Sequence, residues 1–269
     1  MPRNHTHDTA ALDATAQRMA DAARNVILPY FRRPDLSEHN KLAGGYDPVT
    51  EADRAAERAM RDILAQERPE DAILGEEYGS TAGTSGLTWV LDPIDGTRGF
   101  VSGTPTWGVL IAISDDLGPF YGLVDQPYIG ERFIGHHGHA QMTGPHGQAT
   151  LRTRTTSMLG DAVVFTTFPE VGTTKEGAAF HAVAKHAKLT RYGMDCYAYA
   201  LLAAGQVDLV IEAGLQAYDI QAPLALVEAA GGIVTDWQGE PAHQGGRAIA
   251  AANTEIHAQA LAILKDAMS

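Results

Sequence analysis

The sequence has little cysteine, no long apolar run and few positive charges. Its 269 residues include one cysteine, Cys196, which cannot form an internal disulfide and so fits a reducing compartment. Apolar segments such as WGVLIAI fall far short of the roughly 20 residues that a membrane-spanning helix needs. Residues 1–33 lack the apolar segment of a signal peptide. We therefore expect a cytoplasmic protein with no membrane partner.

The scarcity of positive charge limits the partners further. Lys and Arg number 20 against 33 Asp and Glu, so the formal net charge is −13. Such a chain has no spare positive charge to neutralise the phosphates of nucleic acid. If the protein handles a phosphate group, a bound cation has to help. What the sequence does have is 45% hydrophobic residues, enough for a chain of this length to bury a sizeable core.

Apolar periodicity predicts helices followed by strands in the first half of the chain. Residues 12–27 repeat apolar side chains at helical spacing before Pro29 and Pro34, and residues 55–64 repeat the pattern. Short apolar runs bounded by Gly, Pro and Asp predict strands at 72–74, 88–91, 107–113, 120–124 and 132–135. This order favours an α+β unit with an antiparallel sheet.

The second half alternates strands and helices, as α/β units do. Strands are expected at 162–167, 208–212, 232–236 and 248–252, with helices near 177–187, 197–205 and 220–230 and at the end of the chain. The segment TGPHGQAT, residues 143–150, is the most typical of a linker. We therefore expect an α/β (α+β) fold of two subdomains, 1–148 and 149–269.

The stretch LDPIDGT places two carboxylates where a strand is expected to end. Pro93 cannot donate to a sheet ladder, so the strand is expected to stop at Asp92. Asp95, Gly96 and Thr97 then form a tight turn whose N–H groups can point at a ligand. Neighbouring carboxylates repel each other unless a cation lies between them, and Mg²⁺ suits oxygen ligands. The alternative is that both aspartates only cap local turns.

Two further motifs also place carboxylates at the end of an expected strand or the start of an expected helix. GEE places Glu76 and Glu77 after the preceding apolar run, with an acidic surface turn as the alternative. Far along the chain, Asp219 opens an alanine-rich helix, and a helix N-cap is the alternative there. Because the ends of neighbouring strands converge in space, we expect the GEE and LDPIDGT motifs to lie close together.

GEE, LDPIDGT and YD before a small-residue helix, in this order and spacing, resemble the inositol monophosphatase superfamily over about residues 10–265. Tyr218 replaces the usual tryptophan and IQAP the usual small residues, but neither change removes the carboxylate of Asp219. The resemblance implies a layered αβαβα sandwich and a Mg²⁺-dependent phosphomonoesterase. In this family two or three Mg²⁺ ions bind the phosphate, activate the attacking water and stabilise the leaving alkoxide.

The same resemblance implies roles for single residues. The implied metal ligands are Glu76, Asp92, Ile94 (through its carbonyl), Asp95 and Asp219. Glu77 would contribute indirectly, either by supporting a metal ligand or through water. The backbone amides of Gly96 and Thr97 would bind the phosphate.

The implied catalytic residues are Asp53, Thr97 and Glu76, with Asp53 and Thr97 orienting the attacking water. Asp53 also fits a capping box with Thr50 at the start of a helix. Both roles can hold at once.

Two segments resemble the histidinol-phosphate phosphatase branch of the superfamily: GMDCYAYALLAAG and DLVIEAGLQAYD. On this resemblance Asp195, Glu212 and Asp219 contact the substrate, together with residues 104–113 and the loop at 41–47. Acidic contacts favour a cationic alcohol, whereas a neutral polyol needs only hydrogen bonds. The alternatives are a helix N-cap for Asp195 and a strand-end surface acid for Glu212.

L-histidinol phosphate is therefore the expected substrate, which makes the partner a small phosphorylated metabolite of histidine synthesis. Inositol 1-phosphate or another small phosphate ester is the alternative. A non-catalytic metal-binding or regulatory module is an alternative from another class. Family members commonly dimerise, so the resemblance also implies a homodimer.

Three other features are expected to carry no chemistry. Cys196 lacks the downstream arginine of a CX5R loop and is expected to be a packed residue. HHGH, residues 136–139, falls in an expected hairpin turn without acidic or cysteine partners at ligand spacing, so only incidental metal binding is expected there. HTHD, residues 5–8, is expected to be a mobile tail.

Overall fold

The computed structural model describes residues 8–36, 38–40 and 48–269. Its helices are α1 (Thr9–Ile27), α2 (Glu51–Glu67), α3 (Thr97–Ser102), α4 (Thr174–Ala184), α5 (Asp195–Ala203), α6 (Ala217–Ala229) and α7 (Thr254–Met268), with a 3₁₀ turn η1 (Leu159–Asp161). Its strands are β1 (Glu38–Asn40), β2 (Pro48–Thr50), β3 (Ala72–Gly75), β4 (Gly79–Thr81), β5 (Thr88–Asp95), β6 (Gly108–Asp115), β7 (Gly118–Gln126), β8 (Glu131–His136), β9 (His139–Gly144), β10 (Gly147–Thr150), β11 (Val163–Thr166), β12 (Leu189–Tyr192), β13 (Leu209–Leu215), β14 (Ile233–Thr235) and β15 (Gly246–Ala251). No helix within the described ranges is long and apolar enough to cross a membrane.

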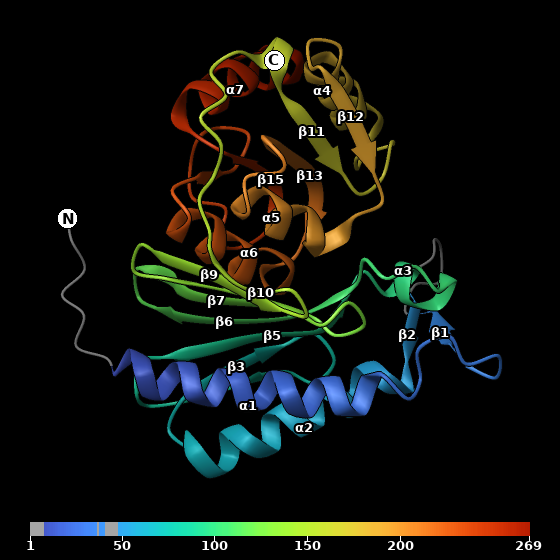
Figure 1. Ribbon diagram of the computed structural model, residues 1–269, viewed down its shortest axis with the longest axis vertical. Coiled ribbons are helices and arrows are strands. Elements are labelled where there is room, and N and C mark those ends of the chain that lie inside the picture. The colour runs from blue at the N-terminus through green and yellow to red at the C-terminus, as the bar shows by residue number, and fades with distance from the viewer. Residues whose placement is uncertain (1–7, 37, 41–47) are drawn as a thin grey trace.

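Helices α1 and α2 form the outer layer of the N-terminal half, beneath the sheet in Figure 1. The apolar stripe of α1, including Leu12, Met19 and Ile27, is buried in one cluster with Trp89 and Ile111 of the sheet. The two helices expected from periodicity are confirmed. Of the tail expected at 5–8, residues 5–7 lie outside the described residues, and Asp8 caps α1 by accepting a hydrogen bond from the backbone N–H of Ala11 at 3.1 Å.

The larger sheet has eight strands in the order β10-β9-β8-β7-β6-β5-β3-β4. Its neighbouring strands are antiparallel except β3 and β5, which run parallel. The expected antiparallel sheet is therefore corrected at one pair. That pair is parallel because β4 runs antiparallel to β3 and residues 82–87 then carry the chain to the other side of β3, where β5 begins.

Residues 143–150, expected to be a linker, belong to this sheet. β9 and β10 form an antiparallel hairpin with Gly144 opposite Gly147. All four residues of β10 are exposed, so no buried face imposes the alternating pattern that marks a strand in a sequence. The prediction of a linker there is wrong. The chain crosses to the second sheet over residues 151–158, which form no helix or strand.

The smaller sheet has the order β12-β11-β13-β15-β14. β11 runs parallel to β12 and β13, and β15 runs antiparallel to β13 and β14. Helices α4 and α7 pack on its outer face, where Phe180 and Leu264 share a buried cluster with Ile211 and Ile249. Helices α5 and α6 lie between the two sheets (Figure 1). The expected αβαβα sandwich is confirmed.

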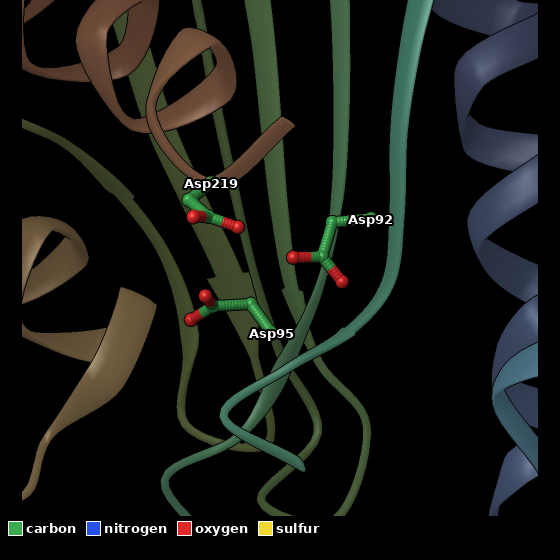
Figure 2. A group of neighbouring side chains, drawn as sticks. All are labelled: Asp92, Asp95 and Asp219. Atoms are coloured by element: carbon green, nitrogen blue, oxygen red, sulfur yellow. The ribbon is translucent and has the colours of Figure 1, made fainter. Parts of the chain in front are cut away.

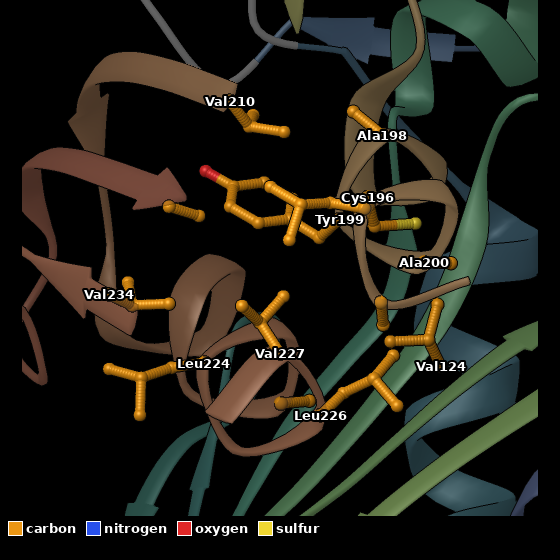
Figure 3. Packing of buried hydrophobic residues seen from close by; sticks show 14 of the residues in the cluster. Val124, Cys196, Ala198, Tyr199, Ala200, Val210, Leu224, Leu226, Val227 and Val234 are labelled. Carbon is orange, nitrogen blue, oxygen red and sulfur yellow. The ribbon is translucent and has the colours of Figure 1, made fainter. Parts of the chain in front are cut away.

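Helix α6 lies unusually close to the larger sheet. A Cβ at Gly122 of β7 would lie 2.1 Å from the carbonyl oxygen of Ala222, and one at Gly135 of β8 would lie 2.5 Å from Cα of Leu226. Figure 3 shows Leu226 and Val227 of this helix packed in the core between the sheets. Glycine at these two strand positions therefore allows the short distance between α6 and the sheet, and so determines where the first turn of α6 lies.

Candidate active site

Three carboxylates meet at the end of β5 and the start of α6 (Figure 2). Asp92, Asp95 and Asp219 each offer an oxygen within 4.8 Å of the others. Strand β5 does not stop at Asp92 as expected but continues through Pro93 to Asp95, with a register shift against β6 between the two aspartates. Such an irregularity accommodates a residue that cannot donate to the ladder and re-aims side chains.

Local hydrogen bonds fix each of these carboxylates. Asp92 Oδ1 accepts from the backbone N–H of Ile94 at 3.0 Å, which is the turn-capping role considered as an alternative. Asp95 Oδ2 accepts from the N–H of Cys196 at 2.6 Å, which ties β5 to α5. Asp219 is not the N-cap of α6, because Gln216 holds that position and donates its N–H to Asp219 Oδ2 at 2.6 Å.

The cluster is electrostatically unfavourable without a cation. Burial raises the pKa of Asp92 well above its usual range, and the nearby carboxylates of Glu76, Asp95 and Asp219 raise it further. Burial likewise raises the pKa of Asp95, with added repulsion from Asp195 and Asp219. A divalent cation among these oxygens favours the ionised forms, and an all-oxygen donor set suits a hard ion. The residues present therefore fit a metal ion.

The GEE turn lies beside this cluster, as expected. Glu76 lines the same cavity as Asp92 and Asp95. Glu77 is not a surface acid, because its side chain is 3% exposed and its carboxylate lies 3.8 Å from Nε of Arg54. Because Glu76 lines the cavity and the Glu77 side chain is buried, the two glutamates do not form an acidic surface turn.

A residue that the sequence analysis missed holds this turn. Glu57 of α2 is fully buried, and its carboxylate accepts from the N–H groups of Glu77 at 2.7 Å and Tyr78 at 3.3 Å and from Nε of Arg61 at 2.8 Å. A Cβ at Gly75 would lie 2.0 Å from Glu57 Oε1, so the glycine of GEE makes room for this carboxylate. Glu57 could have been found from the sequence, because it lies on the apolar stripe of α2 and a buried carboxylate there requires hydrogen-bond partners.

Asp53 caps a helix as expected and also lies beside Thr97. It forms the capping box of α2, with Oδ2 accepting from Thr50 N at 2.9 Å and Thr50 Oγ1 at 2.5 Å. Its Oδ1 lies 3.5 Å from Thr97 Oγ1, which also donates to the carbonyl oxygen of Ile94 at 3.0 Å. Burial, reinforced by Glu76 and Glu77, raises the pKa of Asp53 to about 7 despite the bonds from Thr50.

Gly96 places the start of α3 against the cavity. Its φ of 84° lies in the left-handed region, and it is the N-cap of a helix that begins at Thr97. A Cβ there would lie 2.7 Å from Cγ of Asp195, so both the backbone conformation and the close approach require glycine. The first N–H groups of a helix have no acceptor within the helix and can bind an anion.

Two acidic side chains line the cavity beyond the three-aspartate cluster. The cavity has a volume of about 260 Å³ and includes Asp195 and Glu212 in its lining. Asp195 is not an N-cap, since it is the first residue of α5 with a φ of 47°, and its Oδ2 accepts from Thr106 Oγ1 at 3.1 Å. Burial raises its pKa, and the charge of Arg98 opposes that rise.

Glu212 is a buried residue of β13 rather than a surface acid. It is 8% exposed, and its Oε1 accepts from the N–H of Thr167 at 3.1 Å and from Thr167 Oγ1 at 2.8 Å. Burial raises its pKa to about 8, although the bonds from Thr167 oppose the rise. Across the cavity lining, the guanidinium of Arg98 lies 4.7 Å from the centre of the exposed Phe168 ring.

The remaining expectations have mixed outcomes. Cys196 is buried and free, as expected. The HHGH segment forms the β8–β9 turn, with His136 opposite His139, and the described part of the chain offers no group of possible metal ligands other than the three-aspartate cluster. The substrate loop expected at 41–47 lies outside the described residues.

A cavity in which carboxylates from a strand end and a helix meet beside a helix start is typical of metal-dependent enzymes that act on phosphate groups. A model of the inositol monophosphatase family matches residues 8–269. The chain belongs to the inositol monophosphatase family, as its motifs predict.

Individual relatives agree with this assignment. The chain is 40% identical over 264 residues to the bifunctional phosphatase IMPL2, chloroplastic, of Arabidopsis thaliana, covering 94% of this chain and 74% of the relative. It is 35% identical over 257 residues to a histidinol-phosphatase of Streptomyces coelicolor, covering 93% of this chain and 95% of the relative. The solved structure of an inositol monophosphatase from Zymomonas mobilis matches with a TM-score of 0.84 and 38% identity, over 96% of this chain and 99% of that one. The chain is a phosphatase of this family.

Proposed function

We propose that this phosphatase is a Mg²⁺-dependent enzyme that hydrolyses L-histidinol phosphate to L-histidinol and phosphate. The observation that carries the proposal is the pair Asp195 and Glu212, which line the cavity in addition to the metal-binding carboxylates. Buried carboxylates are costly unless they meet positive charge or protons. The ammonium and imidazole groups of histidinol supply that charge, and a neutral alcohol does not.

The residues that would hold Mg²⁺ are Glu76, Asp92, Ile94 (through its carbonyl), Asp95 and Asp219. When bound, two or three Mg²⁺ ions supply positive charge to the phosphate and the leaving oxygen.

The chain's own groups do the positioning. The amides of Gly96 and Thr97 lie where α3 starts and would bind phosphate oxygens. The hydroxyl of Thr97 and the carboxylate of Asp53 lie close enough to hold and orient the attacking water, and Asp53, with a pKa of about 7, can accept its proton.

Two alternatives predict different behaviour. The likeness to an inositol monophosphatase structure favours inositol 1-phosphate or another small neutral ester, which the cavity would bind by hydrogen bonds alone. A non-catalytic metal-binding or regulatory module would bind metal without releasing phosphate from any ester; the intact carboxylate cluster speaks for catalysis. A role in histidine synthesis, a cytoplasmic location, a homodimer and the two subdomains 1–148 and 149–269 stay predictions.

The proposal is tested by comparing kcat/KM for L-histidinol phosphate and inositol 1-phosphate, with Mg²⁺ and with EDTA. We expect histidinol phosphate to be preferred by about a hundredfold or more, which corresponds to about 2.7 kcal/mol in transition-state binding. The opposite preference would replace histidinol phosphate by a neutral ester while keeping the metal-dependent phosphatase. Release from no ester despite bound Mg²⁺ would support the non-catalytic module.

Asp195→Asn tests the charge argument directly. Because the amide keeps the shape but not the negative charge, we expect kcat/KM for histidinol phosphate to fall by about 10-fold to 100-fold, with a much smaller effect on inositol 1-phosphate. Asp161→Asn, an exposed aspartate in η1, is the matched control and should change neither substrate. An equal loss on both esters would assign Asp195 a structural role through its bond with Thr106.

A further inference from the structure

The hydroxyl of Tyr199 is buried without a partner. The residue is 3% exposed, and within the described residues its hydroxyl oxygen has no hydrogen-bond partner. Its ring packs in the core between the sheets with Cys196, Val210 and Val227 (Figure 3). Phenylalanine would fill the same space without the free-energy cost of burying a hydroxyl that has no hydrogen bond. Core packing therefore does not explain why residue 199 carries a hydroxyl group.

The hydroxyls of buried Tyr121 and partly buried Tyr197 are both paired. Tyr121 donates to Asp13 Oδ1 at 2.7 Å, and Tyr197 donates to Glu131 Oε2 at 2.6 Å. Tyr199 differs from both because it also lines the active-site cavity. An unmet donor in the wall of a binding cavity is available to a ligand.

The position of Tyr199 connects it with the two acids assigned to the alcohol side of the substrate. It follows Asp195 by four residues on α5, and both residues line the same cavity. Burial raises the pKa of its hydroxyl well above the usual range, and the charge of Glu212 is the next largest cause. The group therefore stays a neutral phenol that can both donate and accept a hydrogen bond.

We propose that Tyr199 is a specificity-determining residue whose hydroxyl hydrogen-bonds a nitrogen-bearing group on the alcohol part of the substrate. With Asp195 and Glu212 it forms a three-point subsite in which two acids attract a cation and the phenol selects an N–H group at a fixed place. This inference rests on the proposed function, since an amine-bearing or imidazole-bearing alcohol gives the hydroxyl its partner. The packed ring holds the hydroxyl in position before the substrate arrives, which lowers the entropy cost of binding.

Tyr199→Phe removes only the hydroxyl, and Tyr197→Phe, two residues away on the same helix and bonded to Glu131 instead, is the matched control. We expect Tyr199→Phe to raise KM for L-histidinol phosphate and Kd for L-histidinol, measured calorimetrically with Mg²⁺, by about tenfold. Its Tm should equal or exceed that of the parent protein, because no satisfied bond is lost. Tyr197→Phe should leave KM and Kd unchanged.

An unchanged KM and an unchanged Kd in Tyr199→Phe would overturn the inference and make the residue part of the core only. Equal increases in KM for histidinol phosphate and inositol 1-phosphate would also overturn it, because specificity would not depend on the hydroxyl. Failure of the proposed function is a separate result, seen in the parent protein as preference for inositol 1-phosphate. In that case, an unchanged KM for inositol 1-phosphate in Tyr199→Phe would show that the hydroxyl does not bind the substrate. A raised KM would show that the hydroxyl binds an alcohol without nitrogen. Either result would overturn the inference.

Discussion

Asp53 shows how one side chain can serve the fold and the site together. One carboxylate oxygen closes the capping box with Thr50, and the other lies 3.5 Å from Thr97 Oγ1. The helix start therefore fixes the carboxylate with little rotational freedom. Burial and the neighbouring glutamates raise its pKa to about 7, so in the proposed mechanism Asp53 can accept a proton from the attacking water near neutral pH.

At Thr97 we expect a loss confined to the chemical step. Thr97→Ala removes the hydroxyl that lies between Ile94 and Asp53, so kcat should fall by about 100-fold while KM changes little. Steady-state phosphate release with saturating Mg²⁺ measures this. Thr97→Ser keeps the hydroxyl and should recover most of the rate. A rise in KM with an unchanged kcat would instead make Thr97 a substrate-binding residue.

Single residues were predictable where a motif marked them and hidden where the fold alone gave them a role. The LDPIDGT and YD motifs identified Asp92, Asp95 and Asp219, which the structure brings together. Glu57 was hidden because the backbone N–H groups that it binds, at Glu77 and Tyr78, lie 20 and 21 residues further along the chain. Helix periodicity marks its position as buried but does not identify these partners. Tyr199 was hidden because an aromatic residue in an apolar helix is the usual mark of a core position.

Among the elements, helix α2 holds the turn between β3 and β4 through side-chain hydrogen bonds. The Glu57 carboxylate binds two consecutive N–H groups of this turn, at Glu77 and Tyr78. Arg61 reaches from the same helix to Thr81 Oγ1 at 3.0 Å. Helix α2 thus fixes the turn that carries Glu76, and a displaced turn would move this carboxylate within the cavity.

We expect Glu57→Gln to weaken metal binding more than catalysis. The amide is nearly the same shape but is a poorer acceptor for two backbone N–H groups, so the Mg²⁺ concentration for half-maximal rate should rise by about 10-fold to 100-fold. The rate at saturating Mg²⁺ should change much less.

Glu67→Gln is the control for this experiment, because Glu67 also lies on α2 but pairs with Arg18 and Thr15 away from the turn. It should leave the Mg²⁺ requirement unchanged. If Glu57→Gln lowered Tm with no change in the Mg²⁺ requirement, Glu57 would be a stabilising residue of the fold without a role in positioning Glu76.

Elements with a buried face were predictable, and elements without one were not. The helical repeat of 12–27 predicted α1, whose apolar stripe is buried. The exposed strand β10 carries no such signal, and the polar, glycine-containing segment around it was taken for a linker. Strand β5 was predicted too short because Pro93 breaks the ladder in most contexts, whereas here a register shift accommodates it.

For the whole molecule, the buried acids link stability to pH and to metal. Without metal, the folded protein holds protons on Glu212, Asp92 and Asp95 that the unfolded chain releases above about pH 4 to 4.5. Because the folded state binds more protons, the free energy of unfolding falls as pH rises from about 4.5 to about 8. A metal ion replaces protons at the aspartates, so its stabilising effect grows with pH.

Thermal unfolding at about pH 5.5 and about pH 8, each in EDTA and in Mg²⁺, tests this linkage. We expect a lower Tm at the higher pH in EDTA and a larger rise on adding Mg²⁺ there. A metal-free protein that is equally stable or more stable at the higher pH would contradict the protonation of these acids in the folded state.

The family resemblance implied the order of the layers, but the placement of α6 was not predictable. Alternating elements predicted two sheets with helices, and the resemblance supplied their stacking. The close approach of α6 to β7 and β8 depends on Gly122 and Gly135, and glycine in a strand has several other uses. Only the folded chain shows which use applies.

Because of that placement, an ion bound by the three aspartates would link the two halves of the chain reversibly. Asp92 and Asp95 come from the larger sheet, and Asp219 comes from a helix that follows the second sheet's strand β13. An ion held by all three closes a loop that includes most of the C-terminal half, so it opposes separation of the halves much as a crosslink would. Unlike a covalent crosslink, such an ion would be bound or released as its free concentration changes, so resistance to proteolysis would rise with the supply of that ion.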